Sequence, residues 1–182
     1  TLSYTTLFRS QEAVRVTRDG LAAVGLSCEI IGGAGTGTFR QESASGLWNE
    51  LQVGSYIFMD RDYRDNQMAP GDLAFEHALF VQTTVMSQTK LGKAIVDAGL
   101  KASSVDSGMP AVWQRPDLKF VKASDEHGVL ELGPQATVAL GDVLWLVPGH
   151  CDPTVNLYDE LIGVRHGRVA SIWPISARGA LL

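Results

Sequence analysis

The sequence VLWLVPGHCDPT, residues 143–154, predicts a strand that ends in a loop carrying polar side chains. Its apolar part, Val143–Val147, is typical of a buried strand, and the Pro-Gly pair that follows ends the strand. His150 and Asp152 are two positions apart, so in an extended backbone they project to the same side. An imidazole beside a carboxylate can bind a divalent metal or form an acid–base pair. The alternative is an ordinary surface turn, because a lone His-x-Asp is a weak signal.

Short apolar, β-branched runs with turn residues between them recur throughout the second part of the chain. They predict strands at Ala78–Val85, Lys93–Val96, Ala102–Val105, Lys119–Val121, Val129–Leu132, Val143–Val147, Leu161–Val164 and Val169–Trp173. Many short strands with almost no helical periodicity indicate an antiparallel β-barrel or sandwich. We expect this β-domain at residues 71–182, after a polar linker, Asp60–Gly71, with a domain boundary near residues 66–72.

In the first part of the chain, the expected helix, strands and glycine-rich loop occur in the order typical of an α/β domain. Residues 11–26 fit one amphipathic helix with Gly25 as its C-cap, and Cys28–Ile31 fits a buried strand. A second strand is expected at Glu50–Val53. Residues 32–38 read GGAGTGT, and a helix, a strand and a glycine-rich loop in this order are expected where an α/β domain binds an anion.

The glycine-rich loop fits neither of two common nucleotide-binding motifs. It lacks the lysine of a Walker loop, and Thr38 stands where the dinucleotide fingerprint has its third glycine. A run of backbone N–H groups with threonine hydroxyls remains, and such a run can bind a single phosphate. Gly54, Ser55 and Tyr56 follow the second expected strand and can add donors to the same phosphate. The alternative is a flexible turn.

Composition narrows the classes of function. The 182-residue chain is 45% hydrophobic and has a net charge of −5, so it offers no basic face for nucleic acid. It contains no run of about 18 apolar residues that would predict a membrane helix, and its two cysteines make no disulfide framework. We therefore expect a cytoplasmic protein without nucleic-acid or membrane partners. Residues 1–10, TLSYTTLFRS, resemble a translated sequencing adapter, and we expect them to be an artefactual tail.

Four segments, in order, resemble one enzyme family: GGAGTGTF, ELQVGSYIFMD, DAGLKASSVDSG and VPGHCDPTVNLYD. They are similar to the C-terminal portion of D-threonine aldolases and of the related D-serine dehydratase-like enzymes. The resemblance implies the alanine-racemase-like fold of type III pyridoxal-phosphate enzymes, in which a (β/α)8 barrel precedes a C-terminal β-domain. Residues 11–70 would then be the last part of the barrel that binds pyridoxal phosphate. The expected fold class is α/β plus all-β.

The resemblance also implies roles for individual residues. The cofactor phosphate would be bound by Gly33, Gly35, Thr36, Gly37, Gly54, Ser55 and Tyr56. His150 and Asp152 match the family's divalent-metal ligands, and Asp106 matches a recurrent position beside the active site to which we assign no role. The lysine that holds pyridoxal phosphate as a Schiff base has no counterpart, since every lysine lies in the β-domain: Lys90, Lys93, Lys101, Lys119 and Lys122. The parent would be a lyase, whereas the chain by itself is expected to be inactive.

The implied reaction of the parent is cleavage of a D-β-hydroxy-α-amino acid to glycine and an aldehyde. Asp152 favours the aldolases, because the second metal ligand of the dehydratase branch resembles cysteine. An imidazole with a carboxylate also favours manganese, magnesium or cobalt over zinc. A D-3-hydroxyaspartate aldolase, a D-serine dehydratase-like enzyme, a non-catalytic β-domain for binding or assembly, and a phosphate module unrelated to pyridoxal stay open. The expected partners are a D-amino acid substrate and a second copy in a homodimer.

Overall fold

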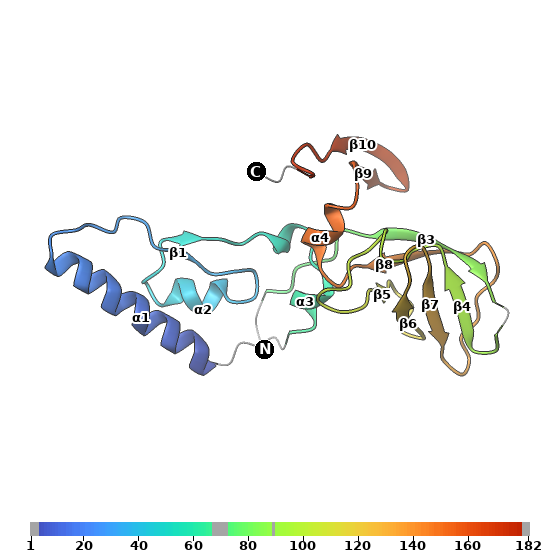
Figure 1. The fold of residues 1–182 in the computed structure, drawn as a ribbon, viewed down its shortest axis with the longest axis horizontal. Helices are drawn as coiled ribbons and strands as arrows, with labels where there is room; N and C mark the ends of the chain where they lie inside the picture. Colours follow the sequence, from blue (N-terminus) through green and yellow to red (C-terminus); the bar gives the residue numbers. More distant parts are fainter. Residues whose placement is uncertain (1–3, 67–72, 89, 180–182) are drawn as a thin grey trace. The chain divides into compact units, whose positions relative to one another are not determined.

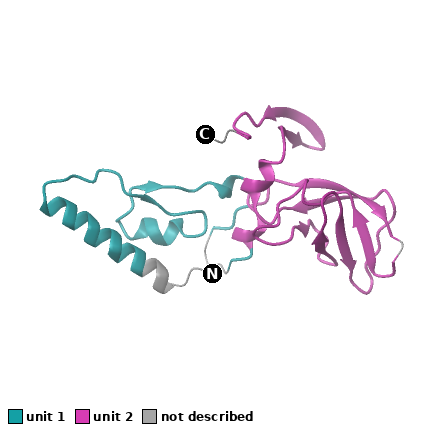
Figure 2. Cartoon of the chain, in the orientation of Figure 1, with its two compact units in different colours: residues 1–57, 65–75 teal, residues 58–64, 76–182 magenta. Residues whose placement is uncertain are grey.

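The computed structural model describes residues 4–66, 73–88 and 90–179, and the chain divides into two units. Unit 1 comprises residues 1–57 and 65–75, and unit 2 comprises residues 58–64 and 76–182 (Figure 2). Most of the predicted boundary at residues 66–72 lies outside the described residues, so its position stays a prediction.

Unit 1 contains helices and one short pair of parallel strands (Figure 1). Its elements are α1 (Tyr4–Ala23), β1 (Gly32–Gly33), α2 (Phe39–Ala44), β2 (Glu50–Leu51) and the 3₁₀ helix η1 (Ser55–Ile57). β1 and β2 pair in parallel, with Gly32 opposite Glu50. A parallel pair next to helices agrees with the α/β class, whereas a (β/α)8 barrel stays an expectation.

The helix predicted at residues 11–26 is confirmed, and α1 begins earlier than expected. Gln11, Val14, Arg18 and Leu21 form its half-buried stripe at helical spacing. Gly25 has a φ of +79°, and the N–H groups of residues 25 and 26 donate to the carbonyls of residues 22 and 21, which is a Schellman C-cap. Residues 4–10 belong to the same helix, and their proposed adapter origin stays a prediction.

The strand predicted at Cys28–Ile31 is wrong, because β1 starts only at Gly32. The Asn49 side chain hydrogen-bonds to backbone groups that would otherwise bond to a neighbouring strand. Its Oδ1 accepts from the Ile31 N–H at 2.8 Å, and its Nδ2 donates to the Glu29 carbonyl at 2.7 Å. With these groups satisfied by a side chain, Cys28 to Ile30 remain exposed and irregular.

Unit 2 contains an antiparallel sheet with the strand order β5-β8-β3-β4-β7-β6. The strands are β3 (Val81–Ser87), β4 (Lys93–Val96), β5 (Ala111–Val112), β6 (Leu118–Ala123), β7 (Gly128–Leu132) and β8 (Val143–Val147). The edge strands β5 and β6 also contact each other, so the sheet is nearly closed. Of the two predicted alternatives, barrel and sandwich, the structure shows the barrel.

One strand prediction in this unit is wrong and one strand was missed. Residues 102–105 form no strand: the N–H groups of Ala102 and Ser103 both donate to the carbonyl of Gly99 in a turn, and residues 104 and 105 are irregular. β5 is only two residues long, which is too short to produce an alternating pattern in the sequence.

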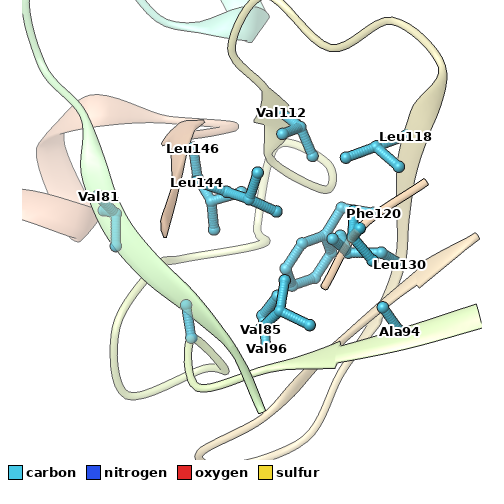
Figure 3. Packing of buried hydrophobic residues seen from close by; sticks show 12 residues of the cluster. Val81, Val85, Ala94, Val96, Val112, Leu118, Phe120, Leu130, Leu144 and Leu146 are labelled. Atoms are coloured by element: carbon cyan, nitrogen blue, oxygen red, sulfur yellow. The ribbon is translucent and has the colours of Figure 1, made fainter. Parts of the chain in front are cut away.

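The barrel is filled by side chains that alternate along the strands. Figure 3 shows Leu130, Phe120, Val85 and Leu146 pointing toward one another from different strands. β8 is buried mainly on one face, since Leu144 and Leu146 lie in the core while Val143 and Trp145 on the other face are exposed; Val147, at the end of that face, is buried. The prediction of a buried strand is therefore confirmed for the inner face and wrong for Val143 and Trp145.

A hairpin follows the barrel strands in sequence. β9 (Glu160–Arg165) and β10 (Arg168–Pro174) pair antiparallel with each other. His166 and Gly167 connect them with positive φ values of 50° and 72°, as a tight hairpin turn requires. Among the described residues, no helix is long and apolar enough to cross a membrane.

The segment 58–64 is hydrogen-bonded to the residues that directly follow β8. Arg61 and Asp62 donate their backbone N–H groups to the carbonyls of residues 148 and 149, and Arg61–Arg64 forms α3. Asp60 is fully buried, and its carboxylate accepts from the backbone N–H of Cys151 at 2.8 Å and of Tyr63 at 3.1 Å. The prediction of a polar linker starting at Asp60 is therefore wrong for this segment, because these groups are bonded within unit 2.

Replacing Leu130 by alanine should lower the free energy of unfolding by about 2–5 kcal/mol, because it truncates a core side chain and leaves a cavity. Chemical denaturation followed by tryptophan fluorescence measures this change. The matched control is Leu140→Ala, at a side chain that is 73% exposed, and it should change stability by less than about 0.5 kcal/mol. Equal losses at both positions would contradict the assigned core.

Replacing Asp60 by asparagine should cost about 1–3 kcal/mol, because one of two buried backbone N–H groups then faces an amide nitrogen instead of a carboxylate oxygen. The same denaturation experiment reports the loss, and Asp125→Asn, at an exposed position, serves as the control. Unchanged stability in Asp60→Asn would show that the carboxylate does not hold the end of β8.

Candidate functional site

The end of β8 presents the two residues singled out in the sequence. His150 has an extended backbone, with φ −141° and ψ 128°, and α4 (Cys151–Val155) starts directly after it. Asp152 therefore lies in the first turn of a short helix rather than on a loop. The helix starts here because the buried Asp60 carboxylate accepts the N–H of Cys151, which no intrahelical carbonyl could satisfy.

The structure brings the His150 and Asp152 side chains together. His150 Nε2 lies 3.9 Å from Asp152 Oδ2, and both side chains are accessible to solvent. One imidazole nitrogen and one carboxylate oxygen on the same side are a donor set that suits a divalent ion such as manganese or magnesium. The described residues contain no group of three or more His, Cys, Asp or Glu arranged to hold a metal.

A second carboxylate contacts the opposite nitrogen of the same imidazole. His150 Nδ1 lies 2.9 Å from Asp106 Oδ2, although the two residues are 44 positions apart in the sequence. The hydrogen bond with His150, followed by one from Ser104, lowers the pKa of Asp106 below its ordinary value. Burial alone would lower the pKa of His150, but the hydrogen bond and charge of Asp106, with the charges of Asp152 and Asp60, raise it.

Cys151 lies between the two candidate ligands in sequence, and its thiol donates to the carboxylate of one of them, Asp152. The residue is buried, and its Sγ lies 3.1 Å from Asp152 Oδ1. This arrangement fits a small core residue beside the site.

The glycine-rich loop in unit 1 has the properties of an anion site. Among the described residues, the backbone N–H groups of Gly35, Thr36 and Gly37 donate to no protein acceptor. The Thr36 side chain is buried, and its Oγ1 accepts from the N–H of Tyr56 at 3.1 Å, which leaves its own O–H to donate. Consecutive unpaired amides with a hydroxyl are the donors that a phosphate needs, so these residues fit the phosphate of pyridoxal phosphate.

The Thr36–Tyr56 contact joins the two segments that the sequence analysis assigned to one phosphate. Ser55 is buried beside it, in η1. Thr38 does not add a second donor, because its hydroxyl donates to Glu42 at 2.5 Å. At Gly33, an added Cβ would lie 2.8 Å from the Trp48 ring, so only glycine fits there without displacing the indole. The predicted phosphate residues thus lie in unit 1, and the predicted metal ligands lie in unit 2.

Three side chains near the candidate site residues have roles that the sequence did not predict. Asp60 and Glu42 were given no function, and Asp106 was noted only through the family resemblance. The sequence does carry one signal for Asp60, since a carboxylate directly after the apolar run Ile57–Met59 is placed at the edge of buried structure. The Asp106–His150 contact joins distant positions, and nothing in local spacing could have predicted it.

Comparison with known proteins identifies relatives of this chain. Residues 78–164 match the family model described as "Putative serine dehydratase domain". The chain is 52% identical over 170 residues to a 3-hydroxy-D-aspartate aldolase from Paracoccus denitrificans (strain Pd 1222), which covers 91% of the chain and 44% of the relative. It is 50% identical over 156 residues to a D-threonine aldolase from Arthrobacter sp., which covers 85% of the chain and 41% of the relative.

A solved structure agrees with the sequence relatives. The crystal structure of D-threonine aldolase from Filomicrobium marinum superposes with a TM-score of 0.93 at 47% identity, over 98% of this chain and 49% of the other. The chain thus spans less than half the length of these two aldolases. It is a member of the family of D-threonine aldolases and D-serine dehydratase-like enzymes, and it corresponds to a C-terminal part of them.

Proposed function

We propose that this chain is part of a pyridoxal-phosphate- and divalent-metal-dependent aldolase. Its substrates would be D-β-hydroxy-α-amino acids, which are cleaved to glycine and an aldehyde. The observation that carries the proposal is the imidazole–carboxylate pair of His150 and Asp152, with its donor atoms 3.9 Å apart, in a chain half identical to named aldolases. This pair offers the oxygen and nitrogen donors of a hard divalent ion.

In this proposal His150 and Asp152 bind the metal ion, and a bound divalent ion would supply a Lewis acid that acidifies the substrate's β-hydroxyl. His150 is suited to this role because Asp106 occupies its Nδ1, so that Nε2 is the nitrogen facing Asp152. Manganese, magnesium or cobalt suits an imidazole–carboxylate donor set better than zinc, and the buried thiol of Cys151 donates to the Asp152 carboxylate.

The loop of unit 1 would hold the cofactor through its phosphate. The N–H groups of Gly35, Thr36 and Gly37 and the Thr36 hydroxyl would donate to phosphate oxygens, with Gly33, Gly54, Ser55 and Tyr56 shaping the same cradle. Pyridoxal phosphate would supply the electron-accepting ring for carbon–carbon cleavage. These residues would fix the position of the cofactor and leave its chemistry to the groups around the ring.

The residue that binds the cofactor covalently would come from outside this chain. No lysine precedes Lys90, and the lysines present all lie at positions 90–122. The relatives are more than twice as long as the matching region, which leaves room for the expected (β/α)8 barrel with its lysine. We therefore propose that the chain by itself has no aldolase activity. From the family resemblance we also propose that the parent protein is a dimeric enzyme.

A dehydratase is the second candidate, because the matching family model carries a dehydratase description. Asp152 favours the aldolase, since a carboxylate stands where the resemblance places a cysteine in the dehydratase branch. The products separate the two reactions. The full-length protein, given D-threonine or 3-hydroxy-D-aspartate with Mn²⁺, should release glycine, whereas a dehydratase would release ammonia and a 2-oxo acid. Ammonia without glycine from both substrates would overturn the aldolase assignment.

Replacing Asp152 by alanine in the full-length protein should lower kcat for glycine formation by about 10²–10³-fold, because a metal ligand worth several kcal/mol is lost. Mn²⁺ binding, followed by electron paramagnetic resonance, should weaken in parallel, while cofactor absorbance stays unchanged. Asp125→Ala is the matched control at an exposed aspartate of the same unit. Full activity of Asp152→Ala in the presence of a chelator would contradict the metal role.

Replacing Thr36 by alanine should weaken binding of the cofactor phosphate by about tenfold, because one hydrogen bond to a charged group is removed. Equilibrium dialysis of the full-length protein with pyridoxine 5′-phosphate, which forms no Schiff base, measures this directly. Thr36→Ser keeps the hydroxyl and should bind nearly as well as the unaltered protein. The phosphate role fails if Thr36→Ala and Thr36→Ser bind the probe equally tightly.

A further inference from the structure

The Asp106 carboxylate is held from two sides. Its Oδ1 accepts the hydroxyl of Ser104 at 2.7 Å, and its Oδ2 lies 2.9 Å from His150 Nδ1. With one oxygen committed to Ser104, the other is aimed at the imidazole. About half of the Asp106 side chain is exposed, so the packing of apolar neighbours does not explain its orientation.

These contacts belong to a closed circuit of hydrogen bonds. The backbone N–H of Ser104 donates to Thr154 Oγ1 at 3.2 Å, and the Thr154 hydroxyl donates to the His150 carbonyl at 2.8 Å. The circuit therefore leads from the His150 side chain through Asp106, Ser104 and Thr154 back to the His150 backbone. Thr154 is almost fully buried, in α4, which anchors the circuit to the barrel unit.

Direct backbone contact fixes the loop that contains Asp106 against the segment that contains His150. An added Cβ at Gly149 would lie only 2.1 Å from the carbonyl oxygen of Gly108, so the two backbones are in direct contact. The loop that carries Asp106 therefore cannot shift relative to His150 without breaking both this contact and the circuit.

The geometry determines where the imidazole proton lies. An ionised carboxylate only accepts hydrogen bonds, so the nitrogen facing Asp106 must carry the hydrogen. Neutral His150 is then the Nδ1–H tautomer, and its lone pair lies on Nε2, the nitrogen 3.9 Å from Asp152 Oδ2. A metal-binding histidine commonly donates its second ring N–H to a carboxylate in this way.

We propose that Asp106 is a positioning residue that fixes the tautomer and ring orientation of His150, so that Nε2 is presented to a divalent metal together with Asp152. This role rests on the proposed function, because the tautomer of His150 affects a metal ion only if His150 and Asp152 bind one. Ser104 and Thr154 support this role, because their hydrogen bonds fix Asp106 relative to the His150 backbone.

The experiment uses the full 182-residue chain and reads the tautomer directly. Long-range ¹H–¹⁵N spectra of the imidazole nitrogens, recorded without metal at a pH where His150 is neutral, should show the Nδ1–H form. His150→Gln identifies the signals. Asp106→Ala should shift His150 toward the Nε2–H form that free histidine prefers, whereas Asp106→Asn, whose side-chain oxygen still accepts, should retain the Nδ1–H form. Asp125→Ala should leave it unchanged.

Mn²⁺ titration of the same proteins provides the second readout. Asp106→Ala should bind Mn²⁺ about 10–100-fold more weakly than the unaltered chain, and Asp106→Asn should lose less. Should circular dichroism show that Asp106→Ala is unfolded, Asp106→Asn and Ser104→Ala carry the comparison, with Ser104→Ala expected to give a mixture of tautomers.

Two results separate this proposal from the metal assignment. If the chain binds Mn²⁺ equally well with and without the Asp106 carboxylate and the tautomer does not change, the positioning role is refuted while the metal role stands. If no protein binds Mn²⁺ but the tautomer responds to Asp106→Ala, the metal role is refuted, whereas the control of His150 by Asp106 is supported.

Discussion

The Asp60 carboxylate is the interaction on which the arrangement of the site depends. A buried charge is tolerated only where hydrogen bonds replace the lost hydration, and Asp60 obtains two of them from backbone N–H groups. One of these groups belongs to Cys151, so the same contact starts α4 and sets the direction in which His150 and Asp152 leave β8. The other belongs to Tyr63, in α3, so the carboxylate also fixes the segment that precedes the barrel strands.

The two candidate sites, one in each unit, are built by different physical means. In unit 1 the donors are backbone amides and one hydroxyl, which recognise the shape and charge of an anion and require little from side chains. In unit 2 the donors are side chains, and their orientation depends on partners such as Asp106. Substitutions in the unit 1 site act mainly through backbone geometry, whereas those in the unit 2 site act through charge and proton position.

Much of the barrel could be predicted from sequence, because alternation and β-branched residues mark each longer strand. β8 and β4 were predicted at their observed limits, because a short apolar run bounded by turn residues marks where a strand begins and ends. The family motifs likewise indicated which loops carry the candidate site. What could not be predicted depends on tertiary partners. Asn49 replaces a strand at Cys28–Ile31, and Asp60 is buried although the residues that follow it, Arg61 and Asp62, are charged. The Asp106–His150 contact joins two loops that only the folded barrel brings together.

The hairpin of β9 and β10 has a consequence for the dynamics of the chain. In the described structure its strands hydrogen-bond as a two-stranded sheet, and Ile162, Val169 and Trp173 are more than half exposed. A two-stranded ribbon has little cooperative support, so it opens at a lower free energy than the barrel strands. Amide protons of the hairpin would then exchange with solvent through local fraying. Those of β3 and β7 would exchange only when the whole barrel unfolds. The chain thus combines a slowly exchanging frame with a segment that samples open states far more often.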